Sequence, residues 1–134
     1  MSDANKKLVR GFLERINAGD LGAVDELVSD DFVEHEEIPG LVPGKAGVKQ
    51  MFEMFHSAFS NAKFEADEVL GDGDRLFVRS RITGTHRGEF MGIPATGWTI
   101  NVGVFDNFRV ADGQLAEHWG VLDTGALMQQ LAGG

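Results

Sequence analysis

Cysteine is absent from the 134 residues of this sequence. Its absence excludes disulfides, thiolate zinc sites and thiol nucleophiles. The sequence also has no apolar run near the ~20 residues that a bilayer-spanning helix needs, and its polar first residues lack the apolar stretch of a signal peptide. We therefore expect a cytoplasmic protein without a membrane partner, whose chemistry depends on oxygen and nitrogen groups.

Basic residues are scarce relative to acidic ones. Twelve Lys and Arg against 21 Asp and Glu give a formal net charge of −9. This charge repels phosphate backbones and anionic lipid surfaces, so nucleic acids and membranes are not expected partners. The same charge favours solubility and does not indicate the substrate. The length and a hydrophobic fraction of 43% fit one domain covering residues 1–134.

Sequence motifs of several enzyme classes are missing. There is no Gly-x-x-x-x-Gly-Lys-Ser/Thr segment for nucleotide phosphates, no Gly-x-Ser-x-Gly elbow for acyl-enzyme chemistry, and no His-x-x-x-His pair for zinc. His35 stands among Glu34, Glu36 and Glu37, but side chains at consecutive positions cannot all converge on one ion. We therefore expect no metal and no cofactor, which leaves proton transfer by side chains.

Apolar residues in the first part of the sequence follow the three-four spacing of helices. Ser2 or Asp3 can cap the first helix, Gly19 ends it, and Asp20 can cap the second. A loop rich in proline and glycine, residues 38–44, separates these helices from a third one. The predicted helices span residues 2–19, 20–28 and 45–59.

From Lys63 onward the apolar period changes to two, which is typical of strands. Glycine-containing turns at residues 71–74 and 111–113 predict two hairpins. The predicted strands span residues 32–35, 64–70, 75–85, 99–110 and 115–123, and a short helix containing Ala126, Leu127 and Leu131 follows. Segregated helices and strands predict an α+β fold, in which an antiparallel sheet has one face covered by helices.

Alternation in the last strand favours Asp123 as a reactive group. It places one row of side chains on the same face, namely Leu115, Glu117, Trp119, Val121 and Asp123. A carboxylate at the end of an apolar row is poorly solvated, which raises its proton affinity and suits it to proton transfer near neutral pH. Alternatively, Asp123 caps the terminal helix that begins near Thr124.

The histidines differ in how well they fit this hypothesis. His86 ends an apolar row of the preceding hairpin and could donate a hydrogen bond to a substrate carbonyl, or it could be an ordinary surface residue. His118 has the parity opposite to Asp123, so a direct hydrogen bond between them is not expected. We therefore rank His118 and His56 below His86 and His35 as site residues.

Three segments together resemble the SnoaL-like polyketide cyclase family, also called ester cyclases. They are Gly84 to Gly97, the turn Asp112-Gly113, and the run Glu117 to Asp123. The resemblance extends over nearly the whole chain, through residues 32–35 and 44–59. It implies the nuclear transport factor 2 fold, a cystatin-like α+β barrel in which a cone of curved antiparallel sheet wraps around helices. It also implies an interior cavity and a homodimer through the outer face of the sheet.

The resemblance also implies an activity, which is ring closure by an intramolecular aldol reaction on a polyketide ester, without metal or cofactor. The family's acid/base aspartate corresponds to Asp123, and its pocket histidines correspond to His35 and His86. The expected substrate is small and apolar or aromatic. The expected substrate-binding residues are Trp119, Phe52, Phe55, Met91 and Trp98, although the phenylalanines could also be plain core residues.

The chain departs from the family pattern in ways that leave the substrate open. It has Ala95 and Trp98 where the family often has a proline and a basic residue, and it contains no tyrosine. Two alternatives to a cyclase therefore stay open. One is a hydrolase or isomerase of a small apolar molecule on the same fold, and the other is a non-catalytic module that binds ligands or dimerises.

Overall fold

The computed structural model describes residues 2–36 and 38–133. Its helices are α1 (Ser2–Asn17), α2 (Gly22–Leu27), α3 (Gly44–Ala58) and α4 (Thr124–Leu131). Its strands are β1 (Val28–Glu34), β2 (Phe59–Asp72), β3 (Arg75–His86), β4 (Thr99–Ala111) and β5 (Gln114–Leu122). None of the helices in the described ranges combines the length and the apolar character needed to span a bilayer.

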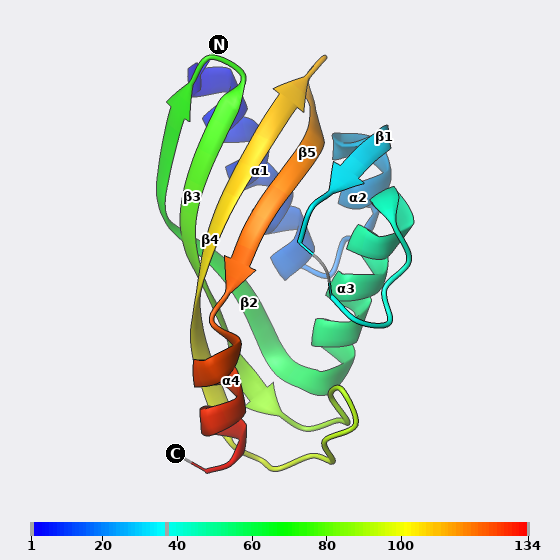
Figure 1. The fold of residues 1–134 in the computed structure, drawn as a ribbon, viewed down its shortest axis with the longest axis vertical. Helices are drawn as coiled ribbons and strands as arrows, with labels where there is room; N and C mark the ends of the chain where they lie inside the picture. The colour runs from blue at the N-terminus through cyan, green and yellow to red at the C-terminus, as the bar shows by residue number, and fades with distance from the viewer. Residues whose placement is uncertain (1, 37, 134) are drawn as a thin grey trace.

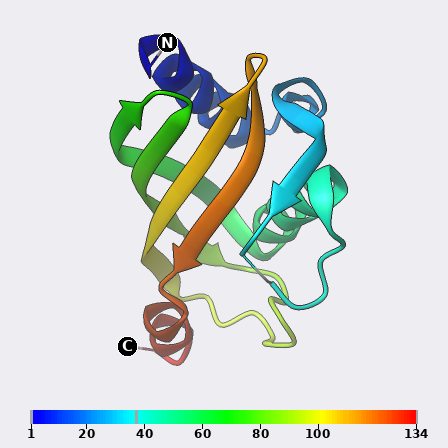
Figure 2. The same ribbon diagram turned by 45° about the horizontal axis from the view of Figure 1, so that its top comes forward.

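The strands form one curved sheet in the order β1-β5-β4-β3-β2. In Figure 1 the helix α1 lies behind this sheet, and the 45° turn of Figure 2 shows α1 and α3 together along the same side. The predicted α+β class, with a curved sheet around N-terminal helices, is therefore confirmed. One detail differs, because β1 pairs with β5 in parallel and the sheet is mixed.

The helices form where the sequence patterns predict them. Val9, Phe12 and Ile16 of α1 are buried against the sheet, as their helical spacing requires. The N-cap of α2 is Leu21, so the expectation that Asp20 caps this helix is wrong by one residue. The Oδ1 of Asp20 accepts a hydrogen bond from the backbone N–H of Gly22 at 3.1 Å, which stabilises the turn before the helix. These contacts place α1 over the concave face of the sheet.

Both hairpins form at the predicted turns, but β2 begins earlier than expected, at Phe59. The hairpin of β4 and β5 contains a bulge, because Val110 pairs with Leu115 whereas Arg109 pairs with Glu117. The extra residue is Ala116, and both Leu115 and Ala116 are buried. A bulge of one residue moves all following side chains to the opposite face. It therefore decides which residues of β5 face the core.

Candidate functional site

A cavity of about 100 Å³ lies between the helices α1 and α3 and the concave face of the sheet. Its wall is mostly apolar, with aromatic side chains that include Phe12, Phe52 and Phe55. Only five polar side chains line it among the described residues: Glu34, Glu36, Ser80, Asp106 and His118. Such a mostly apolar hollow with a few convergent polar groups is the usual form of a small-molecule site.

His118 connects the polar groups of the cavity. Its Nε2 lies 2.6 Å from Oδ1 of Asp106 on β4, and its Nδ1 lies 2.5 Å from Oε2 of Glu34 on β1. A carboxylate oxygen can only accept, so both ring nitrogens must donate and the ring is an imidazolium. The side chain of His118 is therefore fixed between two carboxylates on neighbouring strands.

His118 stays protonated although its side chain is buried. Desolvation alone lowers the pKa of a buried histidine, but the hydrogen bonds to Asp106 and Glu34 outweigh it and raise the pKa of His118 to about 10. The ring is thus protonated at neutral pH. It lies as a fixed cation among the carboxyl groups at one end of a mostly apolar cavity.

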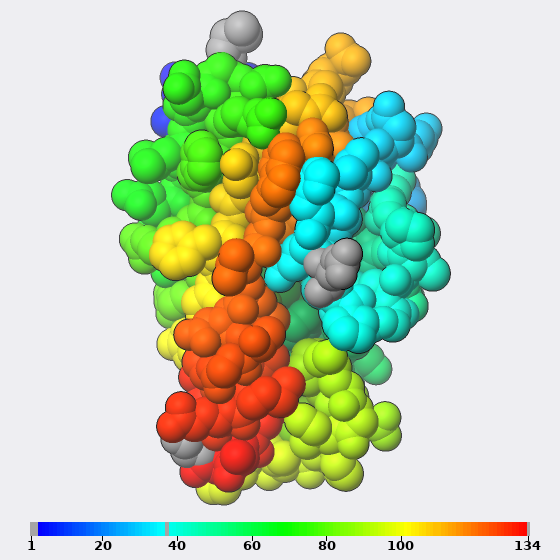
Figure 3. All heavy atoms as spheres, viewed as in Figure 1, coloured from blue at the N-terminus to red at the C-terminus, as the bar shows by residue number. Residues whose placement is uncertain are grey.

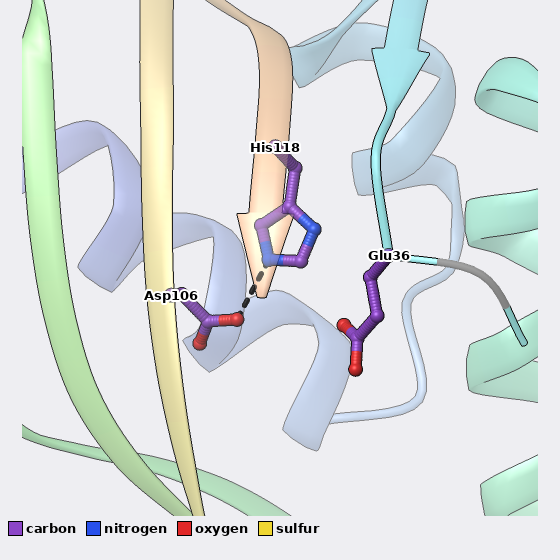
Figure 4. Close-up of side chains that lie close together, drawn as sticks. All are labelled: Glu36, Asp106 and His118. Atoms are coloured by element: carbon purple, nitrogen blue, oxygen red, sulfur yellow. Dashed lines mark hydrogen bonds and ion pairs between the residues drawn. The ribbon is translucent and has the colours of Figure 1, made fainter. Parts of the chain in front are cut away.

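Glu36 lies at the same end of the cavity, just after β1. Figure 4 shows its carboxyl group pointing to the space beside the carboxyl group of Asp106 and the ring of His118. Burial raises the pKa of Glu36, and the charge of His118 opposes this rise only in part. The neighbouring carboxylates of Asp106 and Glu34 raise it further.

Glycine at position 120 allows these groups to come together. A Cβ atom there would lie 2.6 Å from Cε1 of His118 and 2.7 Å from Oε1 of Glu36, closer than real side chains approach. Gly120 also pairs with Asp106 across the strands β4 and β5. Only glycine therefore leaves room for the imidazole and the carboxyl group on this part of the sheet.

The same three side chains have the composition of a metal site. Ligand-capable atoms of Glu36, Asp106 and His118 all lie within 4.8 Å of one another, and nitrogen and oxygen donors of this kind suit several divalent metals. A metal ion binds a deprotonated imidazole nitrogen. His118 would first have to lose one of its two ring protons, each of which is hydrogen-bonded to a carboxylate. We therefore interpret the cluster as a network of charged hydrogen bonds without a metal ion.

A second, larger pocket adjoins the cavity. Its volume is about 560 Å³, and its walls are Glu34, Glu36, the loop of residues 38–43 and the first turns of α3. Both hollows share Glu34, Glu36, Ile38, Val48 and Met51. Glu36 therefore stands where the outer pocket meets the inner cavity.

Asp123 lies outside both hollows. Its side chain is exposed, and its Oδ1 accepts a hydrogen bond from the backbone N–H of Ala126 at 3.0 Å, which makes it the N-cap of α4. The expectation of a poorly solvated carboxylate at the end of an apolar row is therefore wrong. The cause is the bulge at Ala116, which turns the row of Trp119 and Val121 to the outer face of the sheet.

His86 is completely buried but does not line the cavity. Its Nδ1 accepts hydrogen bonds from the hydroxyl group and the backbone N–H of Thr96, at 3.0 and 3.2 Å. Its ring packs on Phe59, with 5.2 Å between the ring centroids. In this position His86 holds the loop that follows β3, and the expected place at the mouth of the pocket is wrong.

His35 and Trp119 lie on the outer face of the sheet. Their rings stack with 4.6 Å between centroids, and Nε2 of His35 lies 2.6 Å from Oε2 of Glu117. Met91 and Trp98 are exposed and also lie outside the cavity wall. Of the predicted substrate-binding residues, the structure brings Phe52 and Phe55 into the cavity and leaves the other three outside it.

The sequence interpretation missed four residues, Glu34, Glu36, Asp106 and His118. One signal for Asp106 was available, because it interrupts the alternating inward row of Ile100, Val102, Val104 and Phe108. A carboxylate in such a row needs a partner inside the fold. His118 had no comparable signal, since its parity depends on the bulge.

Comparison with known protein families identifies the family of this chain. The profile of the SnoaL-like polyketide cyclases matches residues 6–131. The chain belongs to the SnoaL-like polyketide cyclase family. Its resemblance to this family, suggested by the sequence motifs, is therefore confirmed. No curated protein gives a significant match to the chain.

Solved structures from streptomycetes share the fold. TsrD from Streptomyces laurentii is 27% identical, with a TM-score of 0.87 over 96% of this chain and 95% of that chain. AclR from Streptomyces galilaeus, described as a candidate hydroxylase, is 27% identical, with a TM-score of 0.85 over 98% of each chain. IdmH from Streptomyces antibioticus, described as a candidate polyketide cyclase, is 28% identical, with a TM-score of 0.82 over 95% of this chain and 97% of that chain.

Proposed function

We propose that this SnoaL-like protein is a cofactor-independent acid/base enzyme that closes a ring by an intramolecular aldol reaction. The observation that supports the proposal is the pair of Asp106 and His118 at the end of an apolar cavity. A carboxylate at the end of a mostly apolar hollow can act as a base toward a carbon acid, and the charge of the neighbouring imidazolium offsets part of the negative charge that develops on oxygen. The family assignment favours the same reaction class.

In the proposed reaction, a carboxylate oxygen of Asp106 takes a proton from a carbon next to a carbonyl group. The enolate that forms attacks a second carbonyl carbon of the same molecule, which forms the new carbon–carbon bond. The resulting alkoxide takes up one proton, so the net change is the transfer of one proton from carbon to oxygen. His118 stabilises negative charge during both steps, and the cavity holds the two carbonyl groups close together.

The substrate that fits best is a compact neutral ester or ketone. An inner volume of about 100 Å³ accepts only the reacting end of a molecule, and the outer pocket of about 560 Å³ can hold the rest. Three carboxyl groups surround the one imidazolium at the inner end, which disfavours anionic substrates. This substrate class goes beyond the family assignment and is part of the proposal.

The base can be tested without the natural substrate. Opening of 5-nitrobenzisoxazole begins with removal of a carbon-bound proton and ends with cleavage of the N–O bond, which releases a coloured phenolate. Asp106→Asn removes the base and should lower this turnover by roughly 100-fold or more, as is usual for loss of a general base. His118→Gln should lower it too, and Asp72→Asn at an exposed hairpin turn is the matched control.

Each result of this assay bears on the proposal. Loss of turnover in Asp106→Asn with full turnover in Asp72→Asn supports it. A wild-type protein that does not accelerate the reaction, or an Asp106→Asn variant as active as wild type, contradicts it. Ligand binding without any turnover would favour the non-catalytic module. Hydrolysis of esters without ring closure would favour the hydrolase alternative.

We also propose a homodimer formed through the outer face of the sheet. This face carries exposed apolar side chains on neighbouring strands, Leu70, Phe77, Phe105 and Val121. Figure 3 shows this side of the molecule, with the strands β3, β4 and β5 uncovered by helices. Arg79 and Arg81 lie beside acidic residues of β2 on the same face, so two copies related by a twofold axis can pair opposite charges.

Light scattering tests the dimer. Phe105 is 64% exposed at the centre of this face, and Phe105→Glu should convert a dimer to a monomer because it would bury a charge in the interface. Met128→Glu on α4 serves as the control. A wild-type monomer at micromolar concentration contradicts the proposal. The cytoplasmic location and the absence of nucleic-acid partners stay predictions.

A further inference from the structure

The proposed aldol reaction needs a group that returns a proton to oxygen, and the cavity contains a residue in the right place for this step. Glu36 lies beside Asp106 and His118, and ligand-capable atoms of the three side chains are within 4.8 Å of one another (Figure 4). An oxygen atom of the substrate stabilised by His118 would therefore also be within reach of Glu36. We propose that Glu36 is the general acid of this site and delivers the proton to the new alkoxide. This inference rests on the proposed function.

The two carboxyl groups differ in what surrounds them. Asp106 is bonded directly to the imidazolium of His118 and accepts a further contact from the hydroxyl group of Ser80 at 3.4 Å. Glu36 has no ion pair with a lysine, arginine or histidine among the described residues. A contact with a cation keeps a carboxyl group ionised, whereas burial without a cation contact favours the protonated form. Asp106 is therefore suited to accept the first proton, and Glu36 to donate the second.

Charged groups reach Glu36 from three strands. His118 of β5 lowers its pKa, whereas Asp106 of β4 and Glu34 of β1 raise it, and burial has the largest effect, upward. The helix α3 contributes the apolar Val48 and Met51 to the same pocket wall. A carboxyl group whose surroundings favour its protonated form, next to one that is bonded to a cation, forms the pattern of a paired acid and base.

The position of Glu36 also allows the site to return to its starting state. After one reaction, Asp106 holds the proton taken from carbon and Glu36 has lost one to oxygen. The neighbouring carboxyl groups can exchange this proton directly or through a water molecule, so no proton is gained or lost overall. Glu36 also faces the outer pocket of about 560 Å³, through which protons can exchange with solvent.

Two benzisoxazoles distinguish the acid from the base. In both probes Asp106 removes the carbon-bound proton in the same step in which the N–O bond breaks, so negative charge develops on the departing oxygen in that step. The nitro group of 5-nitrobenzisoxazole stabilises the departing phenolate, so this oxygen needs no proton, whereas the more basic oxygen of unsubstituted benzisoxazole benefits from one. Glu36→Gln should therefore lower turnover of the unsubstituted probe by roughly 10- to 100-fold and that of the nitro probe by less than about 3-fold.

The pH profile provides a second test. The acid must be protonated to act, so wild-type turnover of the unsubstituted probe should fall as the pH rises through the pKa of Glu36. Glu36→Gln should remove this alkaline fall, and the fall should be much weaker for the nitro probe in the wild type. Glu53→Gln, at an exposed position of α3, removes the same charge far from the cavity and should change neither profile.

A third test requires no turnover. Carbon NMR of labelled glutamate carboxyl groups, with Glu36→Gln used for assignment, should show that the pKa of Glu36 lies above the ordinary value of a glutamate. If Glu36 titrates at the ordinary value, or if Glu36→Gln slows both probes equally or neither, the role of Glu36 is refuted while the base can still stand. If Asp106→Asn keeps full turnover of both probes, the proposed function itself fails.

Discussion

His118→Gln removes the cation that lies between Glu34 and Asp106, and its effect on stability should depend on pH in a calculable way. The pKa of His118 is about 10 in the folded chain and 6.5 as the ordinary value. A group whose pKa rises on folding stabilises the fold fully below its ordinary pKa, and this stabilisation is lost as the pH rises toward the folded value. From about pH 7 to pH 9 the wild type should therefore lose ~2.5 kcal/mol of unfolding free energy from this group.

Urea unfolding at several pH values measures this loss. The range from about pH 7 to pH 9 suits this measurement because the sequence contains no cysteine and no tyrosine, so few other side chains titrate in this range. His118→Gln should be less stable than wild type at pH 7 by roughly 2–4 kcal/mol, because two carboxylates remain together without their cation. The difference between the two proteins should shrink as the pH rises. A difference that stays constant from about pH 7 to pH 9 would refute the assignment of a buried imidazolium.

Substitutions at three other positions test the remaining structural assignments, all by chemical unfolding and the benzisoxazole assay. Asp123→Asn should keep both stability and turnover because asparagine also caps helices, whereas Asp123→Ala should lose about 1 kcal/mol; loss of turnover in Asp123→Asn would restore Asp123 as a site residue. Gly120→Ala should destabilise the fold by about 1–3 kcal/mol and abolish turnover, since its Cβ would collide with His118. Thr96→Val should lose about 1 kcal/mol because it removes the hydroxyl hydrogen bond to His86 and keeps the one from the backbone N–H, and it should not change turnover.

Much of the fold can be predicted from the sequence because it depends on local patterns. The helical spacing of Val9, Phe12 and Ile16, the turn at Gly19 and Asp20, and the glycine-containing hairpin turns each act within a few residues. The parallel pairing of β1 with β5 is different. It joins segments about 85 residues apart in the sequence, and no local pattern indicates whether they pair in parallel.

The site could be predicted less well than the fold. Phe52 and Phe55 line the cavity because their position depends on the face of one helix, and their role in substrate binding stays a prediction. Glu34 and Glu36 were seen only as part of an acidic run, since their convergence on His118 depends on the pairing of β1 with β5. A distant contact of this kind has no signature in the spacing of residues.

One inserted residue accounts for the largest error. Leu115 faces the core, as expected, and uninterrupted alternation would then bring Glu117, Trp119 and Asp123 to the cavity side. The bulge at Ala116 reverses the phase, so His118 and Leu122 face inward and Trp119 joins the outer face.

The reversal has a physical basis in the partner strand. Asp106 projects inward from β4, where a buried carboxylate requires a cation or a donor. With the bulge, Phe108 pairs with His118, and the imidazole reaches Asp106, two positions away on β4. Without the bulge, Glu117 would pair with Phe108 and would bring a second negative charge next to Asp106. The pairing of opposite charges on the concave face therefore favours the bulged register, and the same register leaves an apolar and aromatic row on the convex face.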